Sequence, residues 1–388
     1  MKRKIIILGS TGSIGTSTLD IIRKDKSNFN IVLLSANNNY RKLIKQAKEF
    51  NPKNVLINNK KFFKIVMKSL KKRRIRVFTG ETPINKIVTS KVDYSMSSIV
   101  GLAGLQPTID IIKISKTVAL ANKETIICSW QILSKLIKKY KTKVLPVDSE
   151  HFSILELTKN FKDNEIEEII ITASGGPFLN TPFNKLSKKK PSEAIKHPNW
   201  KMGKKISVDS ANLMNKVFEV LEAYNLFNFN KKKYKIIIHP QSYVHSIIRF
   251  KNGLVKMVLY NSDMKIPISN TLYEKENNFL NEKKIDIKIL NKMSFQLVNK
   301  KKFPSVNFIQ KCLKMGHSAP IIINASNEVL VKLFLDRKIG FLDIVKTINK
   351  IFKDKEFKKY ATKQPRSVNE IKLIDEWARK KILHLSLI

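Results

Sequence analysis

The sequence predicts an α/β protein with an N-terminal doubly wound parallel sheet, a central α+β region and a C-terminal bundle of helices. Up to about residue 148, short apolar runs alternate with helical patterns, as in stacked βαβ units. After residue 150, strand patterns alternate with glycine-rich turns and a polar loop. From Ala319 onward the apolar spacing is helical at 325–335, 341–352 and 368–385, and Gly340 separates the first two helices. A chain of 388 residues exceeds a single core, so several domains are expected.

The composition excludes some functional classes. The formal net charge is +43, but the lysines are spread over the whole chain together with much Ile and Asn. This pattern does not indicate specific nucleic-acid binding. No apolar run reaches the roughly 18 uncharged residues of a membrane span. The first residues lead directly into a strand pattern, so we expect no signal or transit peptide. Cys128 and Cys312 lie in mostly apolar surroundings, which favours reduced core cysteines. We expect a cytoplasmic protein.

The first strand, residues 4–8, is a continuous apolar run, which is typical of a buried parallel strand. Gly9, Gly12 and Gly15 follow, and residues 16–22 read as a helix. This order places backbone N–H groups and a helix N-terminus where a pyrophosphate can bind, as in a Rossmann-like domain. The alternative is a tight turn without a ligand.

The second strand, residues 30–35, indicates which dinucleotide would bind. Enzymes that use NAD usually carry a carboxylate after this strand, whereas this chain has Ala36, Asn37, Asn38 and Asn39. The absence of a carboxylate favours NADP. Further strands are predicted at 54–57, 76–78, 94–97, 117–120 and 143–147, with a helix at 61–70. Ligands are expected at the carboxyl ends of these strands.

The segment Asp148-Ser149-Glu150 follows the last of these strands. If the strand continues, side chains two residues apart point to one side, so Asp148 and Glu150 would offer two carboxylates to Mg²⁺ or Mn²⁺. The alternative is that Asp148 caps a helix starting near Phe152 and that Glu150 lies in its first turn.

The central region contains further candidate ligand groups. A strand at 165–171 enters a glycine-rich turn with Ser174, and a polar loop around Trp200 suits a mobile lid or, alternatively, a satellite core contact. Asp209 and Ser210 are expected to cap a helix at 211–224 whose polar stripe is either solvated or a set of ligands. Strands are predicted at 236–242 and 254–259, and the first is expected to pair with residues 246–250.

Taken together, the ordered motifs resemble the 1-deoxy-D-xylulose 5-phosphate reductoisomerase family over essentially the whole chain. This family consists of NADPH-dependent enzymes of the non-mevalonate isoprenoid pathway. The matching segments are 9–15, 121–124, 148–150, 173–177, 197–200, 214–216 with Glu219, 239–242, 263–264 and 327–328.

The resemblance implies the residue roles. The metal, Mn²⁺ or Mg²⁺ with Co²⁺ as a further option, would be held by Asp148, Glu150 and Glu219. Catalytic residues would be Lys123, Asp148, Glu150 and Glu219. Substrate contacts would be Lys123, Ser149, Glu150, Ser174, His197, Trp200, Ser210, Asn215, Lys216 and Glu219. Contacts to NADPH would be Thr11, Gly12, Ser13, Ile14, Ala36, Asn37, Asn38, Asn39, Asn122, Glu124, Met202, Gly203 and Met264.

The same resemblance implies rearrangement and reduction of 1-deoxy-D-xylulose 5-phosphate to 2-C-methyl-D-erythritol 4-phosphate, and a homodimer. We expect an NADPH-binding Rossmann-like domain at 1–148 and a catalytic α+β domain at 149–274 that contains the metal and phosphate site and the lid loop. A connecting crossover at 275–305 and a helical bundle at 306–388 are expected to follow.

Three positions depart from the family pattern. Asn37 and Asn38 stand where a glycine and a basic or polar residue are usual, so NADPH affinity is expected to be weaker. Val217 replaces a glycine, and Lys265 replaces an arginine. None of these changes removes an expected metal ligand.

Two competing interpretations are weaker. Another NADP-linked oxidoreductase, such as a semialdehyde dehydrogenase, would need a nucleophilic cysteine, but Cys128 lies in a helical run without an obvious base beside it. A nucleic-acid-binding protein is supported by the charge alone.

Overall fold

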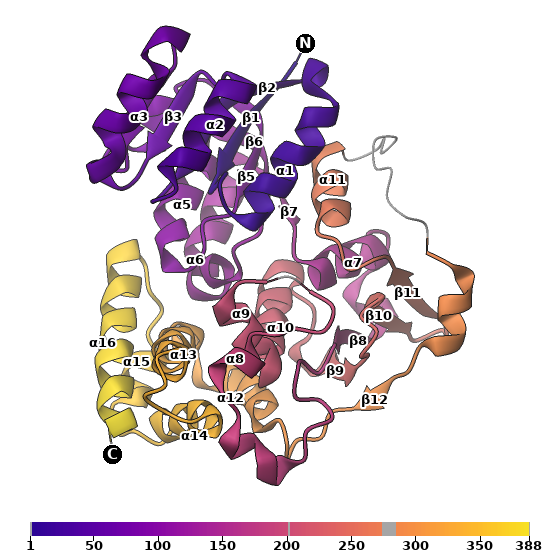
Figure 1. The fold of residues 1–388 in the computed structure, drawn as a ribbon. Helices are drawn as coiled ribbons and strands as arrows, with labels where there is room; N and C mark the ends of the chain where they lie inside the picture. Colours follow the sequence, from indigo (N-terminus) through magenta and orange to yellow (C-terminus); the bar gives the residue numbers. More distant parts are fainter. Residues whose placement is uncertain (1, 201, 274–284, 388) are drawn as a thin grey trace. The chain divides into compact units, whose positions relative to one another are not determined.

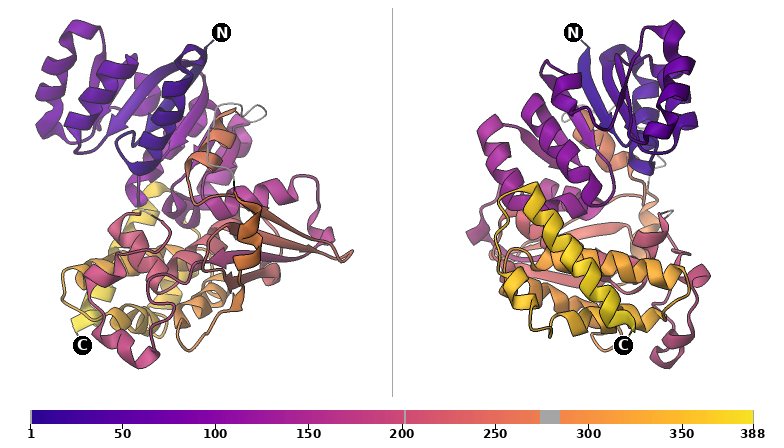
Figure 2. Two further views of the ribbon diagram at one scale, coloured as in Figure 1. Left: turned by 45° about the vertical axis from the view of Figure 1, so that its right-hand side comes forward. Right: turned by 90° about the vertical axis from the view of Figure 1, so that its left-hand side faces the viewer.

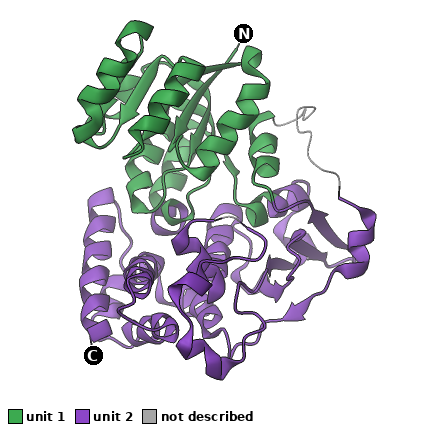
Figure 3. Cartoon of the chain, in the orientation of Figure 1, with its two compact units in different colours: residues 1–125, 131–152, 263–282 green, residues 126–130, 153–262, 283–388 purple. Residues whose placement is uncertain are grey.

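The structure, a computed structural model, describes residues 2–200, 202–273 and 285–387. The chain forms two compact units (Figure 3). Unit 1 contains residues 1–125, 131–152 and 263–282, and unit 2 contains residues 126–130, 153–262 and 283–388. The predicted domain boundaries stay predictions.

Unit 1 is built on a seven-stranded sheet with the order β4-β3-β2-β1-β5-β6-β7 (Figure 1). Every neighbouring pair in this sheet is parallel. The strand order reverses between β1 and β5, so this is the topological switch point at which such sheets bind ligands. The predicted doubly wound sheet is confirmed. Its strands are β1 (Arg3–Leu8), β2 (Phe29–Ala36), β3 (Asn54–Ile57), β4 (Arg76–Thr79), β5 (Val92–Ser97), β6 (Ser115–Leu120) and β7 (Lys143–Pro146).

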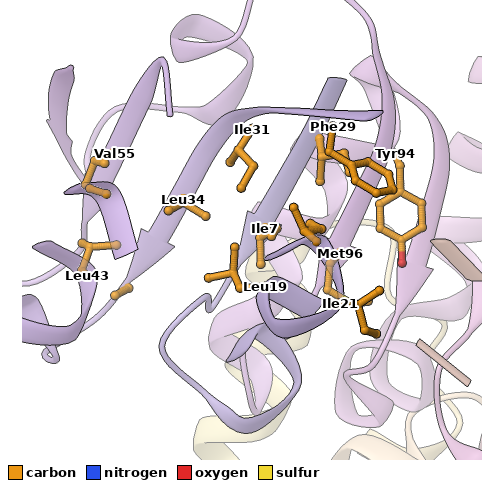
Figure 4. Close-up of a cluster of buried hydrophobic side chains, with 14 of the residues drawn as sticks. Ile7, Leu19, Ile21, Phe29, Ile31, Leu34, Leu43, Val55, Tyr94 and Met96 are labelled. Carbon is orange, nitrogen blue, oxygen red and sulfur yellow. The ribbon is translucent and has the colours of Figure 1, made fainter. Parts of the chain in front are cut away.

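Helices pack on this sheet because alternate strand residues point to its two faces. On one face, Ile7 and Leu34 meet Leu19 and Leu43 in a fully buried apolar cluster (Figure 4). On the sheet, α5 packs against β5 and β6. The helices here are α1 (Ser13–Lys24), α2 (Tyr40–Phe50), α3 (Phe63–Leu70), α4 (Ile84–Ile87), α5 (Leu105–Ile114) and most of α6 (Lys123–Tyr140). Helix α7 (Ser149–Thr158) begins in unit 1 and continues in unit 2.

A late segment of the chain completes the core of unit 1. Helix α11 (Lys265–Tyr273) packs against α1. The hydroxyls of Thr271 and Tyr94 are hydrogen-bonded at 2.9 Å, and the Tyr273 hydroxyl donates to Asp25 at 2.9 Å. Burial and the Asp25 carboxylate raise the pKa of Tyr273, so its hydroxyl stays protonated as the donor. Unit 1 therefore folds from segments more than 100 residues apart.

Unit 2 contains a mixed five-stranded sheet with the order β11-β10-β8-β9-β12. Strands β8 and β9 are parallel, and the remaining pairs are antiparallel. The prediction that residues 236–242 pair with 246–250 is wrong, because β8 lies between β9 and β10 and pairs with both. The connection from β9 passes the end of β8 through Ser242, which has a left-handed φ of 58°. The strands are β8 (Ile166–Ala173), β9 (Tyr234–Ile238), β10 (Val244–Phe250), β11 (Val255–Leu259) and β12 (Gln296–Leu297).

The helix predicted at 211–224 corresponds to α10 (Met214–Phe227), and a separate helix, α9 (Lys204–Ala211), precedes it. Leu213 adopts a left-handed φ of 61°, which breaks the helical path. Asp209 and Ser210 lie inside α9 and are buried, so the prediction that they cap the helix is wrong.

The C-terminal helical region is confirmed. Helix α13 packs against both α14 and α16, and α16 is the long yellow helix in Figure 2. The remaining helices of unit 2 are α8 (Pro191–Ala194), α12 (Phe308–Met315), α13 (Ala319–Leu335), α14 (Phe341–Ile351), α15 (Phe357–Ala361) and α16 (Val368–Leu387).

Three further expectations have different outcomes. Cys128 and Cys312 are both free and buried, as predicted. Residues 275–284 of the expected crossover lie outside the described residues. Over the described part of the chain, each helix is too short or too polar to cross a membrane.

Candidate active site

Unit 1 contains a cavity of about 670 Å³ at the carboxyl ends of its strands. Gly9, Gly12, Ala36 and Asn37 line it, as predicted for a dinucleotide site. The sequence reasoning missed the lining residues that come from the loops after β3, β4 and β5. The rule that ligands bind at carboxyl ends of parallel strands would have found them. They include Asn58, Gly80, Glu81, Thr82, Ser98, Ile99 and Gln106.

The glycine-rich turn leaves room for a phosphate. Gly9 has a φ of +74°, and a Cβ there would lie 2.7 Å from the carbonyl oxygen of Ser98, so only glycine fits. Helix α1 starts at Ser13 without a side-chain cap and without an acidic residue in its first turn. Its first N–H groups and the positive end of its dipole therefore suit an anion.

The other predicted cofactor residues have varied positions. Asn39 caps α2 by accepting from the Lys42 N–H at 3.2 Å. Asn122 caps α6 by accepting from the Thr125 N–H at 3.0 Å, and its Nδ2 donates to Gly101 O at 2.9 Å. Of the rest, Thr11 lines the cavity, Ser13 and Ile14 begin α1, Glu124 lies in the first turn of α6, Met264 packs against the unit 1 core, Asn38 follows β2, and Met202 and Gly203 belong to unit 2.

Asp148 and Glu150 lie at a helix start. Strand β7 ends at Pro146, α7 begins at Ser149, and Asp148 Oδ1 accepts from the Glu150 N–H at 3.3 Å. The argument from strand alternation is therefore wrong, and the capping alternative describes the local backbone. An ionised carboxylate has about four acceptor sites, so accepting one backbone N–H is compatible with binding a metal ion.

Two cationic or polar groups of unit 1 surround Asp148. Lys123 Nζ lies 3.2 Å from its Oδ2, and His151 Nδ1 lies 3.2 Å from its Oδ1. Burial alone would raise the pKa of Asp148, but Lys123, His151 and the hydrogen bonds outweigh it and hold the pKa well below the usual range. The carboxylate is thus ionised at neutral pH. Ser149 Oγ donates to Glu150 Oε2 at 2.5 Å.

In unit 2, His197 joins the turn after β8 to the polar loop. Its Nδ1 accepts the N–H groups of Asn199 at 3.1 Å and Trp200 at 3.0 Å. Its Nε2 lies 2.9 Å from Ser174 Oγ. Burial, together with the positive charge of Lys216, lowers the pKa of His197 to about 4, so the ring is neutral at pH 7. Since Nδ1 accepts, Nε2 carries the proton and donates to Ser174.

The hydrogen-bond partners of Ser174 use its hydroxyl oxygen as an acceptor. Its oxygen accepts from the Gly176 N–H at 3.1 Å and from His197. Its own O–H therefore remains to donate to a ligand. A Cβ at Gly176 would lie 2.7 Å from the carbonyl oxygen of Ser210, so this turn packs directly on the end of α9.

The start of α10 adds charged groups to the same unit. Lys216 Nζ lies 2.5 Å from Glu219 Oε2, and Asn215 Nδ2 donates to Glu219 Oε1. Lys216 and Glu219 are both buried. Unit 2 thus brings together Ser174, His197, Ser210, Asn215 and Lys216, a set of hydroxyl, imidazole, amide and ammonium groups suited to a phosphate.

The polar loop is held by contacts that the sequence reasoning did not predict. Asn199 Nδ2 donates to Pro240 O at 2.6 Å and to Ser242 Oγ at 2.9 Å. The Trp200 ring meets the His245 ring edge to face with centroids 6.0 Å apart, and His245 stacks on Tyr260 at 4.1 Å. The loop is therefore held by defined contacts on its backbone and on its aromatic ring.

Comparison with known proteins assigns the chain to a family. The model of 1-deoxy-D-xylulose 5-phosphate reductoisomerase matches residues 5–130, that of the C-terminal domain of the same enzyme matches 144–227, and that of the DXP reductoisomerase C-terminal domain matches 259–381. The 1-deoxy-D-xylulose 5-phosphate reductoisomerase of Pelagibacter ubique strain HTCC1062 is 47% identical over 99% of this chain and 100% of its own length. The chain belongs to the 1-deoxy-D-xylulose 5-phosphate reductoisomerase family.

Other members of the reductoisomerase family agree. The enzyme of Thermoanaerobacter sp. strain X514 is 40% identical over 98% of each chain. The structure of the Zymomonas mobilis enzyme in complex with NADPH covers 100% of this chain and 99% of its own, with a TM-score of 0.92 and 33% identity. A reductoisomerase structure in complex with NADPH, fosmidomycin and magnesium has a TM-score of 0.93 and 30% identity, covering 99% of this chain and 98% of its own. The resemblance seen in the sequence is confirmed.

Membership of the reductoisomerase family decides between the earlier alternatives, because the match extends over the full length and not over a shared nucleotide fold alone. The departures from the family pattern have clear places in the structure. Asn37 lines the cavity, Val217 is fully buried in α10, and Lys265 begins α11, where its N–H donates to Asp263 Oδ1 at 2.8 Å.

Proposed function

We infer that the chain catalyses the NADPH- and divalent-metal-dependent conversion of 1-deoxy-D-xylulose 5-phosphate to 2-C-methyl-D-erythritol 4-phosphate. The observation that carries this assignment is the full-length similarity to reductoisomerases. Features of each unit support it: unit 1 has a cavity at its glycine-rich turn, and unit 2 has hydroxyl and imidazole groups suited to a phosphate.

We propose that Asp148, Glu150 and Glu219 hold the metal ion, Mg²⁺ or Mn²⁺, with Co²⁺ as a further option. All three side chains end in carboxylates, and hard divalent cations prefer carboxylate oxygens as ligands. Within unit 1, His151 Nδ1 faces Asp148 Oδ1 at 3.2 Å, so this imidazole serves as a partner of the Asp148 carboxylate.

We propose that NADPH binds in the unit 1 cavity, with its pyrophosphate at the glycine-rich turn and the start of α1. The fit rests on the close approach allowed at Gly9 and on the uncapped N-terminus of α1. Thr11, Gly12, Ser13, Ile14 and the segment Ala36 to Asn39 would contact the adenosine half. Asn122, Glu124, Met202, Gly203 and Met264 would contact the nicotinamide half.

The remaining residues bind and orient the substrate. Ser174, His197, Ser210, Asn215 and Lys216 would bind the phosphate, while Ser149 and Lys123 would contact the oxygens near the reacting carbons. When bound, the metal supplies positive charge for the substrate oxygens, and NADPH supplies the hydride.

Lys123 is placed to hold or transfer a proton. Its Nζ lies 3.2 Å from Oδ2 of the ionised Asp148 carboxylate, so the side chain is held beside that carboxylate. Trp200 would cover the substrate and exclude water. Because the phosphate is remote from the reacting bonds, its binding energy can be used to hold the loop over the substrate.

We propose a homodimer in the cytoplasm. The family resemblance supports the dimer, and the two free, buried cysteines fit a reducing compartment.

Product analysis tests the assignment. The purified chain, incubated with 1-deoxy-D-xylulose 5-phosphate, NADPH and Mg²⁺, is expected to yield 2-C-methyl-D-erythritol 4-phosphate, with one NADPH oxidised per product. Reduction without rearrangement of the carbon skeleton would contradict the assignment, because it would show an ordinary ketone reductase.

A further inference from the structure

Four asparagines lie side by side after two strands of unit 1, and two of them, Asn37 and Asn58, line the cavity. Asn37 and Asn38 follow β2, and Asn58 and Asn59 follow β3. The two strands are parallel neighbours, with Ala36 paired to Ile57. Backbone hydrogen bonds continue past the strand ends, because the Asn58 N–H donates to Ala36 O at 2.9 Å and the Asn59 N–H donates to Asn37 O at 3.2 Å. The two pairs of side chains are therefore held in register.

The side chains form two amide-to-amide hydrogen bonds. Asn58 Nδ2 donates to Asn37 Oδ1 at 3.1 Å, and Asn59 Nδ2 donates to Asn38 Oδ1 at 2.9 Å. Both acceptor oxygens of the β2 segment are thus occupied. The groups that Asn37 and Asn38 keep for another molecule are their Nδ2 hydrogens, which are donors. Both side chains are exposed.

A backbone hydrogen bond determines which amide atoms donate and accept in the pair of Asn59 and Asn38. Asn59 Oδ1 accepts from the Lys61 N–H at 3.1 Å, so its Nδ2 faces Asn38. An amide has one oxygen and one nitrogen, so Asn38 must accept with its oxygen and turn its nitrogen away. Asn59 thereby determines which atoms of the Asn38 amide face away from the pair.

In the pair of Asn58 and Asn37, close packing against Gly80 holds the Asn58 side chain in place. A Cβ at Gly80 would lie 1.8 Å from Asn58 Oδ1, so glycine at this position allows Asn58 to occupy its place. Asn37, Asn58 and Gly80 all line the cavity. This packing makes Asn58 sensitive to a single added methyl group on the neighbouring loop.

Nearby charges have other partners. Lys60 pairs with Glu81, the only carboxylate from the β4 loop that lines the described cavity. Lys42 Nζ donates to Thr16 Oγ1 at 2.7 Å, and the Arg41 guanidinium lies over the Tyr40 ring at 5.8 Å. Neutral amide donors are therefore the groups presented after β2, where a carboxylate would accept from a ribose hydroxyl in an NAD site.

We propose that Asn37 and Asn38 recognise the 2′-phosphate of NADPH, and that Asn58 and Asn59 are positioning residues that direct their amide donors outward. This inference rests on the proposed use of NADPH. A phosphate accepts hydrogen bonds from both amides, whereas the 2′-hydroxyl of NADH does so only weakly. The amide pairs thus favour NADPH without a basic side chain.

The test compares the dissociation constants of NADPH and NADH by titration calorimetry. The free energy of a hydrogen bond to a charged group predicts that Asn38→Ala raises the dissociation constant of NADPH about tenfold. The dissociation constant of NADH should stay within about twofold. Asn59→Asp is expected to raise the dissociation constant of NADPH at least as much. The new carboxylate would accept from Asn38 Nδ2, which would turn the Asn38 oxygen toward the phosphate. Gly80→Ala is expected to displace Asn58 and to lower NADPH affinity selectively. Asn30→Ala, at an exposed position of β2, is the matched control and should change neither constant.

Two results would overturn the inference. The first is an equal loss of NADPH and NADH affinity in the asparagine variants, which would show a general structural role. The second is loss of the NADPH preference in Arg41→Gln or Lys61→Gln, which would assign recognition to a cation. If the unaltered chain binds no NADPH, the proposed function itself fails, and that outcome is distinct from both.

Discussion

Replacement of Ser174 by alanine tests the phosphate-binding group most sharply. The Ser174 oxygen accepts from the Gly176 N–H at 3.1 Å and lies 2.9 Å from His197 Nε2, so its O–H is left for the ligand. Ser174→Ala removes this donor and also leaves the His197 N–H without its acceptor. A hydrogen bond to a charged group contributes about 1.5–3 kcal/mol, which predicts a loss of about 10-fold to 150-fold in kcat/KM.

The assay uses substrates with and without the phosphate. NADPH oxidation is followed with 1-deoxy-D-xylulose 5-phosphate and with 1-deoxy-D-xylulose, and Ser187→Ala in the same unit is the control because Ser187 is exposed. The variant should lose activity only on the phosphorylated substrate. A similar loss on both substrates, or no loss, would refute the assignment of Ser174 to the phosphate.

Three further predictions concern the metal group, the histidine and the glycine turn. Asp148→Asn should lower turnover by more than about 100-fold, since even loss of a group that only supports a metal ligand costs 10-fold to 100-fold, while NADPH titration should show unchanged affinity. Burial lowers the pKa of His197 to about 4, so its NMR titration should lie near that pH; below the unfolded value of 6.5 the unfolded chain takes up the proton first, so its contribution to stability is lost as the pH falls from about 6.5 to 4 and is constant above. Gly9→Ala, at a φ of +74°, should destabilise unit 1 by at least about 1–2 kcal/mol in urea unfolding and weaken NADPH binding; unchanged stability would contradict the close approach to Ser98.

Much of the fold could be predicted from local patterns. The buried parallel strands of unit 1 are continuous apolar runs, and the glycine-rich turn and the long C-terminal helices carry clear signals. The predicted strands overlap the observed ones within a few residues. Local patterns did not predict which elements distant in the sequence pack or pair with one another. Strand β8 lies between β9 and β10, and α11 joins the core of unit 1, because tertiary packing decides both.

The candidate site shows the same difference between residues that motifs predict and contacts that only tertiary packing determines. Motif residues such as Ser174 and His197 were identified from the family resemblance, and the structure brings them within hydrogen-bonding distance. No role was predicted for Asn199, whose N–H donates to His197 Nδ1, although it lies in the matching segment 197–200. Leu213 shows why local patterns fail at the site, since its left-handed backbone is unusual for a branched side chain and breaks a helix that its neighbours would continue. Where local preference is overridden, only the folded chain reveals the arrangement.

The most direct test of the account is the metal dependence of NADPH oxidation by the purified chain with 1-deoxy-D-xylulose 5-phosphate. We predict turnover with Mg²⁺ or Mn²⁺, loss of turnover with a chelator, and recovery when the metal is restored. Glu219→Gln should stay inactive after the metal is restored, because it lacks one of the three carboxylates. Turnover that persists in the chelator, or full activity in Glu219→Gln, would contradict the proposed metal site.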